Sequence, residues 1–442
     1  MKYADMVINA RWIIPVEPDG AVYEHYSLVV QDGTILDLLP ATQAKTAYQG
    51  HVTYNLGEHA LIPGLVNAHT HAAMSLFRGL ADDLPLMNWL NDHIWPAEGA
   101  WVSSEFVHDG TQLAIAEMLR GGTTCFNDMY FFPDAAARVA SSSGIRAAIG
   151  LIIIDFPTAW ASDAQEYLNK GLELHDHYRN DPMISTVFAP HAPYTVSDQP
   201  LTHIQTLAEE LDIPIHIHVH ETEDEITRSH QHHNGRPLQR LERLGLVTPR
   251  LLAVHMTQLL DDEIELMASA GAHVIHCPES NLKLASGFCP AHKLQKAGVN
   301  VALGTDGAAS NNDLDMFGEM RTAALLAKAV ANDASAVPAA TALRMATLNG
   351  ARALGLDEVT GSLVKGKAAD MVAVYMGDIE STPIYHPVSQ IVYATGRDKV
   401  TDVWAGGRQL VKDRALITLD ESAIRKKALL WQTKIASRDQ QQ

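Results

Sequence analysis

The sequence predicts an α/β fold in which a (β/α)8 TIM-like barrel carries a small β-sandwich built from both chain ends. Between residues 61 and 360, eight short apolar runs alternate with helix-like segments, which is typical of parallel strands joined by covering helices. Both ends instead contain short strand-like runs separated by turns, and neither end is long enough to form a comfortable domain alone. The length of 442 residues suits one large domain with such an addition.

The two chain ends are predicted to pair into one composite β domain. The strands expected there cover residues 5–10, 27–31, 34–39, 369–374 and 400–404. Turns at Asp32-Gly33 and Gly406-Gly407 follow a strand in each end. The predicted division is therefore residues 1–60 with 361–442 as the β-sandwich, and residues 61–360 as the inserted barrel. The last four residues, 439–442, are expected to fray.

The barrel strands are predicted from apolar runs of strand length. They cover residues 61–68, 123–127, 146–154, 184–189, 215–219, 251–254, 273–275 and 299–303. Helical periodicity between them is clearest over residues 109–120, 201–211 and 261–270. Eight such alternations in about 300 residues favour a closed barrel over a doubly wound open sheet.

Composition excludes several classes of partner. A formal net charge of −19 argues against nucleic acid and anionic membrane surfaces. The three cysteines, Cys125, Cys277 and Cys289, form no CxxC pair and are expected to be reduced thiols. No secretory leader and no apolar run of about 18 residues is apparent, so we expect a cytoplasmic location. Large soluble proteins are often homo-oligomers, and we expect one here.

Histidine or aspartate recurs at the carboxyl ends of five of the eight predicted strands. His69 and His71 lie two residues apart at the end of the first, so in a strand they share one face. The later strand ends carry His191, the run His216-Ile217-His218-Val219-His220-Glu221, His255 and Asp306. Each of these residues alone is compatible with a hydrogen-bonded core or turn position. Together they predict a metal site, because strand ends converge at one face of a barrel and imidazole and carboxylate are ligands of Zn²⁺.

The fifth predicted strand leaves the choice of ligand open. His216, His218 and His220 alternate along one face, so periodicity does not distinguish them. His216 lies earlier in the strand and is expected to be a core residue. His218 is followed after three residues by Glu221, which could reach over a metal as a proton carrier.

At this point the chain resembles the amidohydrolase superfamily, and within it the 5-methylthioadenosine/S-adenosylhomocysteine deaminase family. The motifs that carry the resemblance are PGLVNAHTH at 63–71, WLNDHIWPAE at 89–98, FAPHAPY at 188–194, HVHE at 218–221, LGTDG at 303–307 and GKAADMV at 366–372. They extend over nearly the whole chain. The first and fifth motifs are typical of the superfamily, and the second and third are typical of the deaminase branch.

The resemblance implies a ligand set for one Zn²⁺ per subunit, which could also hold Fe²⁺ or Mn²⁺. The implied ligands are His69, His71, His218 and Asp306. A zinc ion so bound keeps a position for water and lowers its pKa to about 7. Glu221 and Asp306 would then bind substrate and carry protons, and His255 would stabilise the tetrahedral state. Glu98 is implied to bind the ribose hydroxyls, and His191 to contact the purine or ribose.

One departure from the family affects the expected substrate. Relatives that accept S-adenosylhomocysteine well can place an arginine on the loop after the third strand, whereas residues 155–163 contain no basic residue. The expected reaction is therefore hydrolytic deamination of 5′-methylthioadenosine in preference to S-adenosylhomocysteine, with adenosine as a further candidate. The alternatives are a deaminase or dechlorinase of another heterocycle (guanine, a pterin, cytosine or an s-triazine) and, remotely, a non-catalytic scaffold on the same fold.

Overall fold

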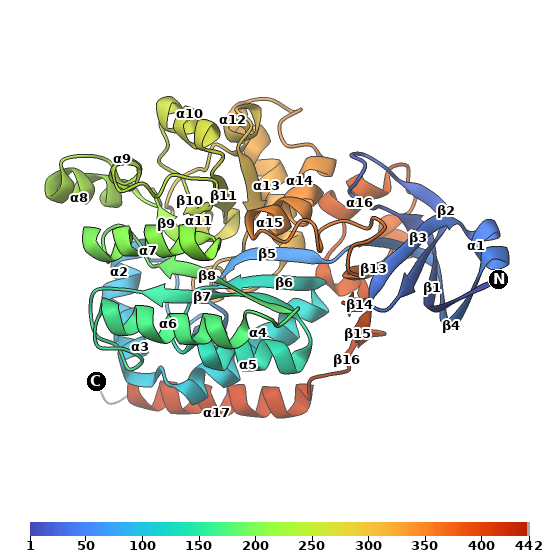
Figure 1. Cartoon of the computed structure of the whole chain (residues 1–442), viewed down its shortest axis with the longest axis horizontal. Helices are drawn as coiled ribbons and strands as arrows, with labels where there is room; N and C mark the ends of the chain where they lie inside the picture. Colours follow the sequence, from blue (N-terminus) through green and yellow to red (C-terminus); the bar gives the residue numbers. More distant parts are fainter. Residues whose placement is uncertain (440–442) are drawn as a thin grey trace.

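Two eight-stranded sheets organise the computed structural model, which describes residues 1–439 (Figure 1). Residues 440–442, which belong to the end that is expected to fray, lie outside the described residues. One sheet forms the barrel in the middle of the chain, and the other joins the two chain ends at one side of it (Figure 1).

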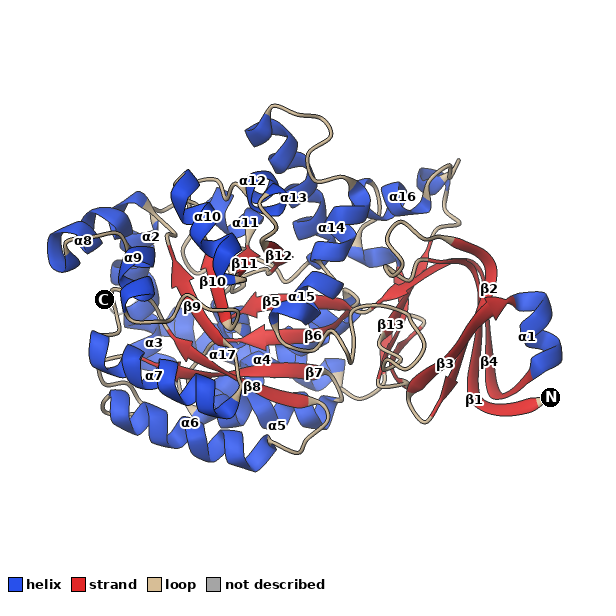
Figure 2. Ribbon diagram, turned by 45° about the horizontal axis from the view of Figure 1, so that its top comes forward, coloured by secondary structure: helices blue, strands red, loops and turns tan. Residues whose placement is uncertain are grey.

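The barrel sheet consists of eight parallel strands in chain order (Figure 2). They are β5 (Leu65–Thr70), β6 (Thr123–Asp128), β7 (Arg146–Ile153), β8 (Ile184–Pro190), β9 (Ile215–Val219), β10 (Leu251–His255), β11 (His273–His276) and β12 (Asn300–Leu303). Beyond β12, the N–H of Asp306 donates to the carbonyl of His69 at 3.0 Å, which brings the last strand back to the first. The predicted barrel is confirmed.

Helices surround these strands, as Figure 2 shows. The longer ones are α4 (Ser104–Arg120), α5 (Pro133–Ser143), α6 (Ala164–Tyr178), α7 (Asp198–Leu211), α8 (Glu223–His233), α10 (Asp261–Ala270) and α13 (Met316–Ala331). Shorter ones are α9 (Pro237–Arg243), α11 (Pro278–Lys283), α12 (Ala291–Lys296), α14 (Ala339–Met345) and α15 (Leu348–Ala353). Local chemistry sets their starts: Ser103 and Asp163 accept N–H groups from the first turns of α4 and α6.

The segment between β5 and α4 folds into short helical pieces over the barrel mouth. They are η1 (Ala72–Phe77), α2 (Leu86–Asn88), the π-helical η2 (Trp89–Ile94) and α3 (Trp95–Trp101). Trp89, Leu90 and Ile94 are buried. Their burial holds this segment against the barrel.

The second sheet contains strands from both chain ends, as predicted. In spatial order they are β16 (Ala415–Leu416), β15 (Arg408–Lys412), β14 (Val400–Ala405), β13 (Met371–Tyr375), β4 (Tyr48–Pro63), β1 (Lys2–Ile13), β2 (Tyr23–Gln31) and β3 (Thr34–Pro40). The ends join where β13 pairs antiparallel with β4. The sheet is continuous and curls over its own apolar core. The curl brings the edge strand β3 back to the chain just before β13, where the N–H of Ile35 donates to the carbonyl of Lys367 at 2.8 Å.

The predicted strand over 61–68 combines the ends of two strands in different sheets. Leu61–Pro63 closes β4, and β5 begins at Leu65. The apolar run is unbroken because both sheets are buried there. Gly64 joins them where a Cβ atom would lie 1.9 Å from the Thr124 hydroxyl oxygen, so no other residue fits. The earlier part of β4, which is largely exposed, carries no apolar run that predicts it.

The remaining helices are α1 (Ala41–Ala47), η3 (Ile379–Ser381), α16 (Pro387–Tyr393), η4 (Arg397–Lys399) and α17 (Glu421–Asp439). In Figure 1, α17 runs along the barrel rather than the second sheet. Lys427 and Trp431 donate to the carboxylate of Asp109 on α4 at 2.7 and 3.1 Å. The division of the chain into 1–60 with 361–442 and 61–360 stays a proposal, and α17 does not follow it.

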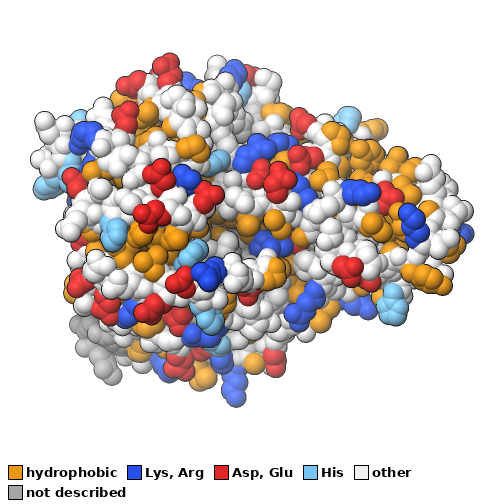
Figure 3. Space-filling model, in the orientation of Figure 1, with side chains coloured by type: hydrophobic (Ala, Val, Ile, Leu, Met, Phe, Trp, Pro, Cys, Tyr) orange, Lys and Arg blue, Asp and Glu red, His pale blue; other side chains and the backbone are white. Residues whose placement is uncertain are grey.

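The described surface carries charges of both signs. On the face in Figure 3, acidic and basic side chains are interspersed. Among the described helices, none is long and apolar enough to cross a membrane.

Candidate active site

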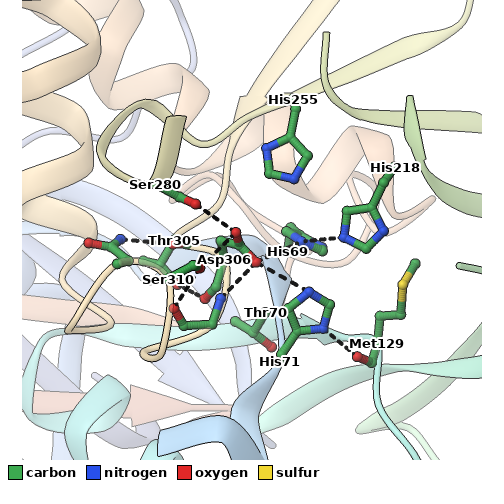
Figure 4. A network of polar contacts seen from close by, with 12 residues as sticks. His69, Thr70, His71, Met129, His218, His255, Ser280, Thr305, Asp306 and Ser310 are labelled. Carbon is green, nitrogen blue, oxygen red and sulfur yellow. Dashed lines mark hydrogen bonds and ion pairs between the residues drawn. The ribbon is translucent and has the colours of Figure 1, made fainter. Parts of the chain in front are cut away.

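Four predicted ligands lie together at the carboxyl end of the barrel, with His255 beside them (Figure 4). The Oδ1 atom of Asp306 lies 3.2 Å from the Nε2 atoms of both His69 and His71. The Nε2 atom of His218 lies 3.3 Å from that of His69. Ligand atoms of His69, His71 and Asp306 fall within 4.8 Å of one another, as do those of His69, His218 and His255. The cluster is compact enough for one metal ion.

The other ring nitrogen of each histidine has its own partner. The Nδ1–H of His71 donates to the carbonyl of Met129, and that of His218 to the carbonyl of His191, both at 2.6 Å. The Nδ1 atom of His69 lies 3.0 Å from the Nε2 atom of His216. These contacts leave each Nε2 lone pair facing the cluster, which is the arrangement that metal-binding histidines require. The donor set therefore fits a divalent cation.

The three histidines in and directly after β9 have different surroundings. His216 is fully buried beneath His69. His220 lies beyond the end of β9 with φ at +55°, and its Nε2 atom accepts the N–H of Leu238 at 3.1 Å. The turn directs His220 away from Asp306. Of the three, only His218 points its Nε2 atom toward the Nε2 atom of another predicted ligand, 3.3 Å from that of His69.

Asp306 is held through both carboxylate oxygens. Its Oδ1 atom accepts the N–H of Gly307 at 2.8 Å, while Oδ2 accepts the hydroxyls of Ser280 and Ser310 at 2.7 and 2.8 Å. Burial alone would raise the pKa of Asp306, but the His69 and His71 rings that lie against its carboxylate hold that pKa well below its usual range. The carboxylate is thus available as an anionic ligand.

Glu221 and His255 face each other beside the cluster. The Nε2 atom of His255 lies 3.8 Å from the Oε1 atom of Glu221. The Nδ1–H of His255 donates to the side-chain oxygen of Asn281 at 2.8 Å, which fixes the ring. Burial raises the pKa of Glu221. A carboxyl group with a raised pKa takes up and releases protons more readily near neutral pH.

Glu98 and His191 lie farther along the same cavity. The Oε1 atom of Glu98 accepts the Tyr130 hydroxyl at 2.7 Å, and desolvation raises the pKa of Glu98 to about 7. His191 lies with its Nδ1 atom 3.0 Å from the Thr195 hydroxyl, and desolvation lowers the pKa of His191 to about 3. At neutral pH His191 is therefore an uncharged hydrogen-bonding group.

The cavity that joins these groups has a volume of about 230 Å³. Its walls away from the His/Asp cluster are mostly apolar: Leu86, Trp89, Leu90, Ile94, Phe131, Phe132, Ile152, Ile154, Phe156, Pro157, Ala159 and Trp160. Among the described residues that line it, none is Lys or Arg. The cavity therefore combines a polar end with an apolar end and has no cationic group for an anionic substrate.

Comparison with known proteins identifies the family. The model of the Amidohydrolase family matches residues 60–410. The chain belongs to the amidohydrolase family. A 5-methylthioadenosine/S-adenosylhomocysteine deaminase from Saccharophagus degradans is 54% identical over 434 residues, which cover 98% of this chain and 97% of that protein.

Two further proteins are similar to this amidohydrolase over nearly its whole length. A 5-methylthioadenosine/S-adenosylhomocysteine deaminase from Teredinibacter turnerae is 50% identical, with 98% of each chain covered. The crystal structure of an adenosine deaminase from Xanthomonas campestris with bound zinc has a TM-score of 0.98 and 55% identity, and the match covers 99% of both chains. The amidohydrolase described here is thus a hydrolase that acts on carbon–nitrogen bonds, and its family is metal-dependent.

Several residues around the site of this amidohydrolase were not predicted from the sequence. Ser280, Asn281 and Ser310 bond Asp306 or His255, and Tyr130 bonds Glu98. A positional signal exists for three of them, because Tyr130 closely follows the end of β6 and Ser280-Asn281 follow the end of β11, just as the predicted residues follow other strands. Their residue types gave no reason to single them out.

Proposed function

We propose that this amidohydrolase is a zinc-dependent deaminase that converts 5′-methylthioadenosine to 5′-methylthioinosine and releases ammonia. One observation carries the proposal: a single cavity connects the His/Asp cluster, the Glu98 carboxyl group and an apolar wall without any Lys or Arg. A nucleoside with an apolar 5′ substituent needs these three surroundings in this order. The relatives that are named for this activity support the same reading.

His69, His71, His218 and Asp306 would hold one ion per chain. The structure from Xanthomonas campestris with bound zinc supports zinc as that ion, although the same ligands could hold Fe²⁺ or Mn²⁺. When bound, zinc supplies a water nucleophile at near-neutral pH and polarises the reacting centre.

The side chains of the cavity then account for the proton transfers. Water adds to the ring carbon that bears the amino group, and Glu221 carries a proton from that water to the neighbouring ring nitrogen. Asp306 accepts the second proton and passes it to the amino group. The carbon–nitrogen bond then breaks, ammonia leaves, and the ring carbon keeps the oxygen as a carbonyl. The imidazole of His255, held by Asn281, stabilises the charge on the attacking oxygen.

The rest of the substrate is assigned to the other end of the cavity. In the carboxylate form, Glu98 would accept hydrogen bonds from the two ribose hydroxyls, with Tyr130 fixing its orientation. Neutral His191 would contact the purine or ribose. Phe156 and Trp160 would cover the methylthio group. The homocysteine part of S-adenosylhomocysteine would bring an unpaired carboxylate into the same place, which is costly away from water.

The experiment is ammonia release measured over a panel of 5′-methylthioadenosine, S-adenosylhomocysteine, adenosine, guanine and an s-triazine. We expect 5′-methylthioadenosine to give the highest kcat/KM. Equal efficiency with S-adenosylhomocysteine would contradict the substrate assignment. Turnover of guanine or the triazine alone would favour the alternative of another heterocycle, and zinc binding without any turnover would favour a non-catalytic scaffold.

We also propose that the enzyme works in the cytoplasm as a homo-oligomer. Cys125, Cys277 and Cys289 are all free and buried, which suits a reducing compartment. Leu429 and Leu430 on α17 are exposed apolar side chains that a second copy could cover. Light scattering of the purified protein measures the mass, and a monomer at micromolar concentration would contradict the second proposal.

A further inference from the structure

Glu221 lies in the turn between β9 and α8, which contains a residue in the left-handed backbone conformation. β9 ends at Val219 and α8 begins at Glu223, so three residues connect the strand to the helix. His220, in this turn, has φ at +55°. Residues with a Cβ atom adopt this left-handed conformation infrequently, so contacts with the surroundings help to hold it. The contacts of the turn therefore decide where the Glu221 side chain points.

Glu225 makes one of the two shortest contacts of this turn. Its Oε2 atom accepts the N–H of Glu221 at 2.7 Å. Glu225 is 5% exposed, and its second carboxyl oxygen has no partner in the described structure. Burial raises the pKa of Glu225 to about 8, so near pH 7 the group acts mainly as a neutral acceptor. This buried carboxyl group is not used by the chemistry assigned above.

The opposite side of the turn is held by the loop after β10. The Thr257 hydroxyl donates to the carbonyl of Glu221 at 2.7 Å, and the Thr257 N–H donates to the carbonyl of His220 at 2.9 Å. The peptide groups on both sides of the Glu221 Cα atom are thus fixed from different elements. The remaining freedom of Glu221 is that of its own side chain.

The contact made by Glu225 differs from an ordinary helix cap. Thr222 is the N-cap of α8, and its hydroxyl accepts the N–H of Glu225 at 3.3 Å. In a capping box, the carboxylate three residues into the helix returns to the N–H of the cap residue itself. Glu225 instead reaches the N–H of the residue before the cap, which is Glu221. The Glu225 side chain, although it belongs to the first turn of α8, therefore stabilises the turn that precedes the helix.

We propose that Glu225 is a positioning residue for Glu221: by holding the Glu221 amide, it fixes the direction in which the Glu221 carboxyl group enters the cavity. The proposal rests on the proposed function for the proton-carrying role of Glu221. It needs an acceptor at position 225 and not a negative charge. A misplacement of about 1 Å in a catalytic group costs up to about 100-fold in rate.

The test compares four variants of the full-length, metal-loaded protein. Glu225→Ala removes the acceptor, Glu225→Asp shortens it, and Glu225→Gln keeps it without the ability to ionise. Thr222→Ala is the matched control, because it removes the cap of the same helix and leaves the bond to the Glu221 amide in place. Metal content and Tm are measured for each variant.

We expect Glu225→Ala and Glu225→Asp to lower kcat by about 10- to 100-fold, with KM within about threefold and metal content unchanged. Glu225→Gln should retain most of kcat. Thr222→Ala should lower Tm, because the helix loses its cap, but should leave kcat nearly unchanged. Unchanged kcat in Glu225→Asp, failure of Gln to restore activity, or an equal loss in Thr222→Ala would each overturn the proposal.

Amide hydrogen exchange separates this proposal from the proposed function. The peptide that contains Glu221 should exchange faster in Glu225→Ala and Glu225→Asp than in the parent and in Glu225→Gln. This readout needs no substrate. If the parent protein deaminates nothing in the panel, the proposed function fails while exchange still decides whether Glu225 holds the turn. Unchanged exchange in both variants would contradict the positioning role.

Discussion

The two ends of the cavity are built in different ways. At the polar end, His69, His71, His218 and Asp306 lie at or just beyond strand ends, and each has a second hydrogen-bonding partner. At the apolar end, the walls come largely from the helical pieces α2 and η2 and from the segments that follow β6 and β7. This difference suggests that the polar end determines the reaction and that the apolar end determines which substrate fits. Strand ends hold a constellation rigidly, whereas loops can change without disturbing it.

The loop after β7 is nevertheless fastened, because helix α6 holds it. Glu166 accepts the N–H of Ser162 at 2.8 Å. The hydroxyl of Tyr167 lies 2.6 Å from that of Thr158, and Lys170 donates to the carbonyl of Trp160. The apolar wall therefore has a defined shape, and substitutions at exposed loop positions can test its chemistry without loosening it.

Removal of the metal should break the polar end and give the largest effect. Dialysis against a chelator should lower kcat at least about 1,000-fold, because a metal ion supplies several kcal/mol of transition-state stabilisation. Tm should also fall, since the ion binds only the folded arrangement of ligands. Elemental analysis should find one ion per chain, and added Zn²⁺ should restore activity. A metal-free protein with full activity would contradict the assigned site.

Substitution of Glu98 tests the junction between the two ends. Glu98→Gln should raise KM for 5′-methylthioadenosine by about 10- to 100-fold, because hydrogen bonds to a charged group are worth about 1.5–3 kcal/mol. The control substrate is the 2′,3′-dideoxy analogue, for which the variant and the parent should differ little. An equal loss with both substrates would show that Glu98 does not read the ribose hydroxyls.

The pH dependence of KM gives a second test of Glu98. The pKa of Glu98 is raised to about 7, so the carboxylate that we propose to accept the ribose hydroxyls forms as pH rises through that value. KM in the parent should therefore fall between about pH 6 and pH 8, and this change should be absent in Glu98→Gln. Initial rates at saturating and limiting substrate separate KM from kcat. The same pH dependence in both proteins would contradict this assignment.

A charge added to the apolar end should give the smallest effect. Ala159 is exposed and lines the cavity. Ala159→Arg should raise kcat/KM for S-adenosylhomocysteine relative to 5′-methylthioadenosine by about fivefold, the value of an ion pair of about 1 kcal/mol. The charge-reversed control, Ala159→Glu, should lower that ratio. A shift in the same direction for both variants would show that size, not charge, limits this end.

Much of the barrel follows from apolar runs, because parallel strands buried on both faces need no polar alternation. Bounds differ from prediction where burial continues past a strand end, as at Leu61–Pro63, which belongs to β4. The exposed part of β4 contains no such run. It forms a strand because it pairs with β1, which its residue composition does not indicate. For the last helix, nothing local predicts that Trp431 reaches Asp109 on α4, 322 residues earlier in the chain.

The sequence by itself determined that histidines and an aspartate would meet at one face of a barrel, because strand period and barrel topology leave few alternatives. It also determined the lack of basic residues in the loop after β7. Only the tertiary structure showed that His216, His218 and His220 have different surroundings, since the three share a period-2 face until the backbone turns at His220. It alone placed Asn281 against His255 and Glu225 against Glu221. Hydrogen bonds of this kind depend on where separate turns bring single atoms, which no local pattern of residue types specifies.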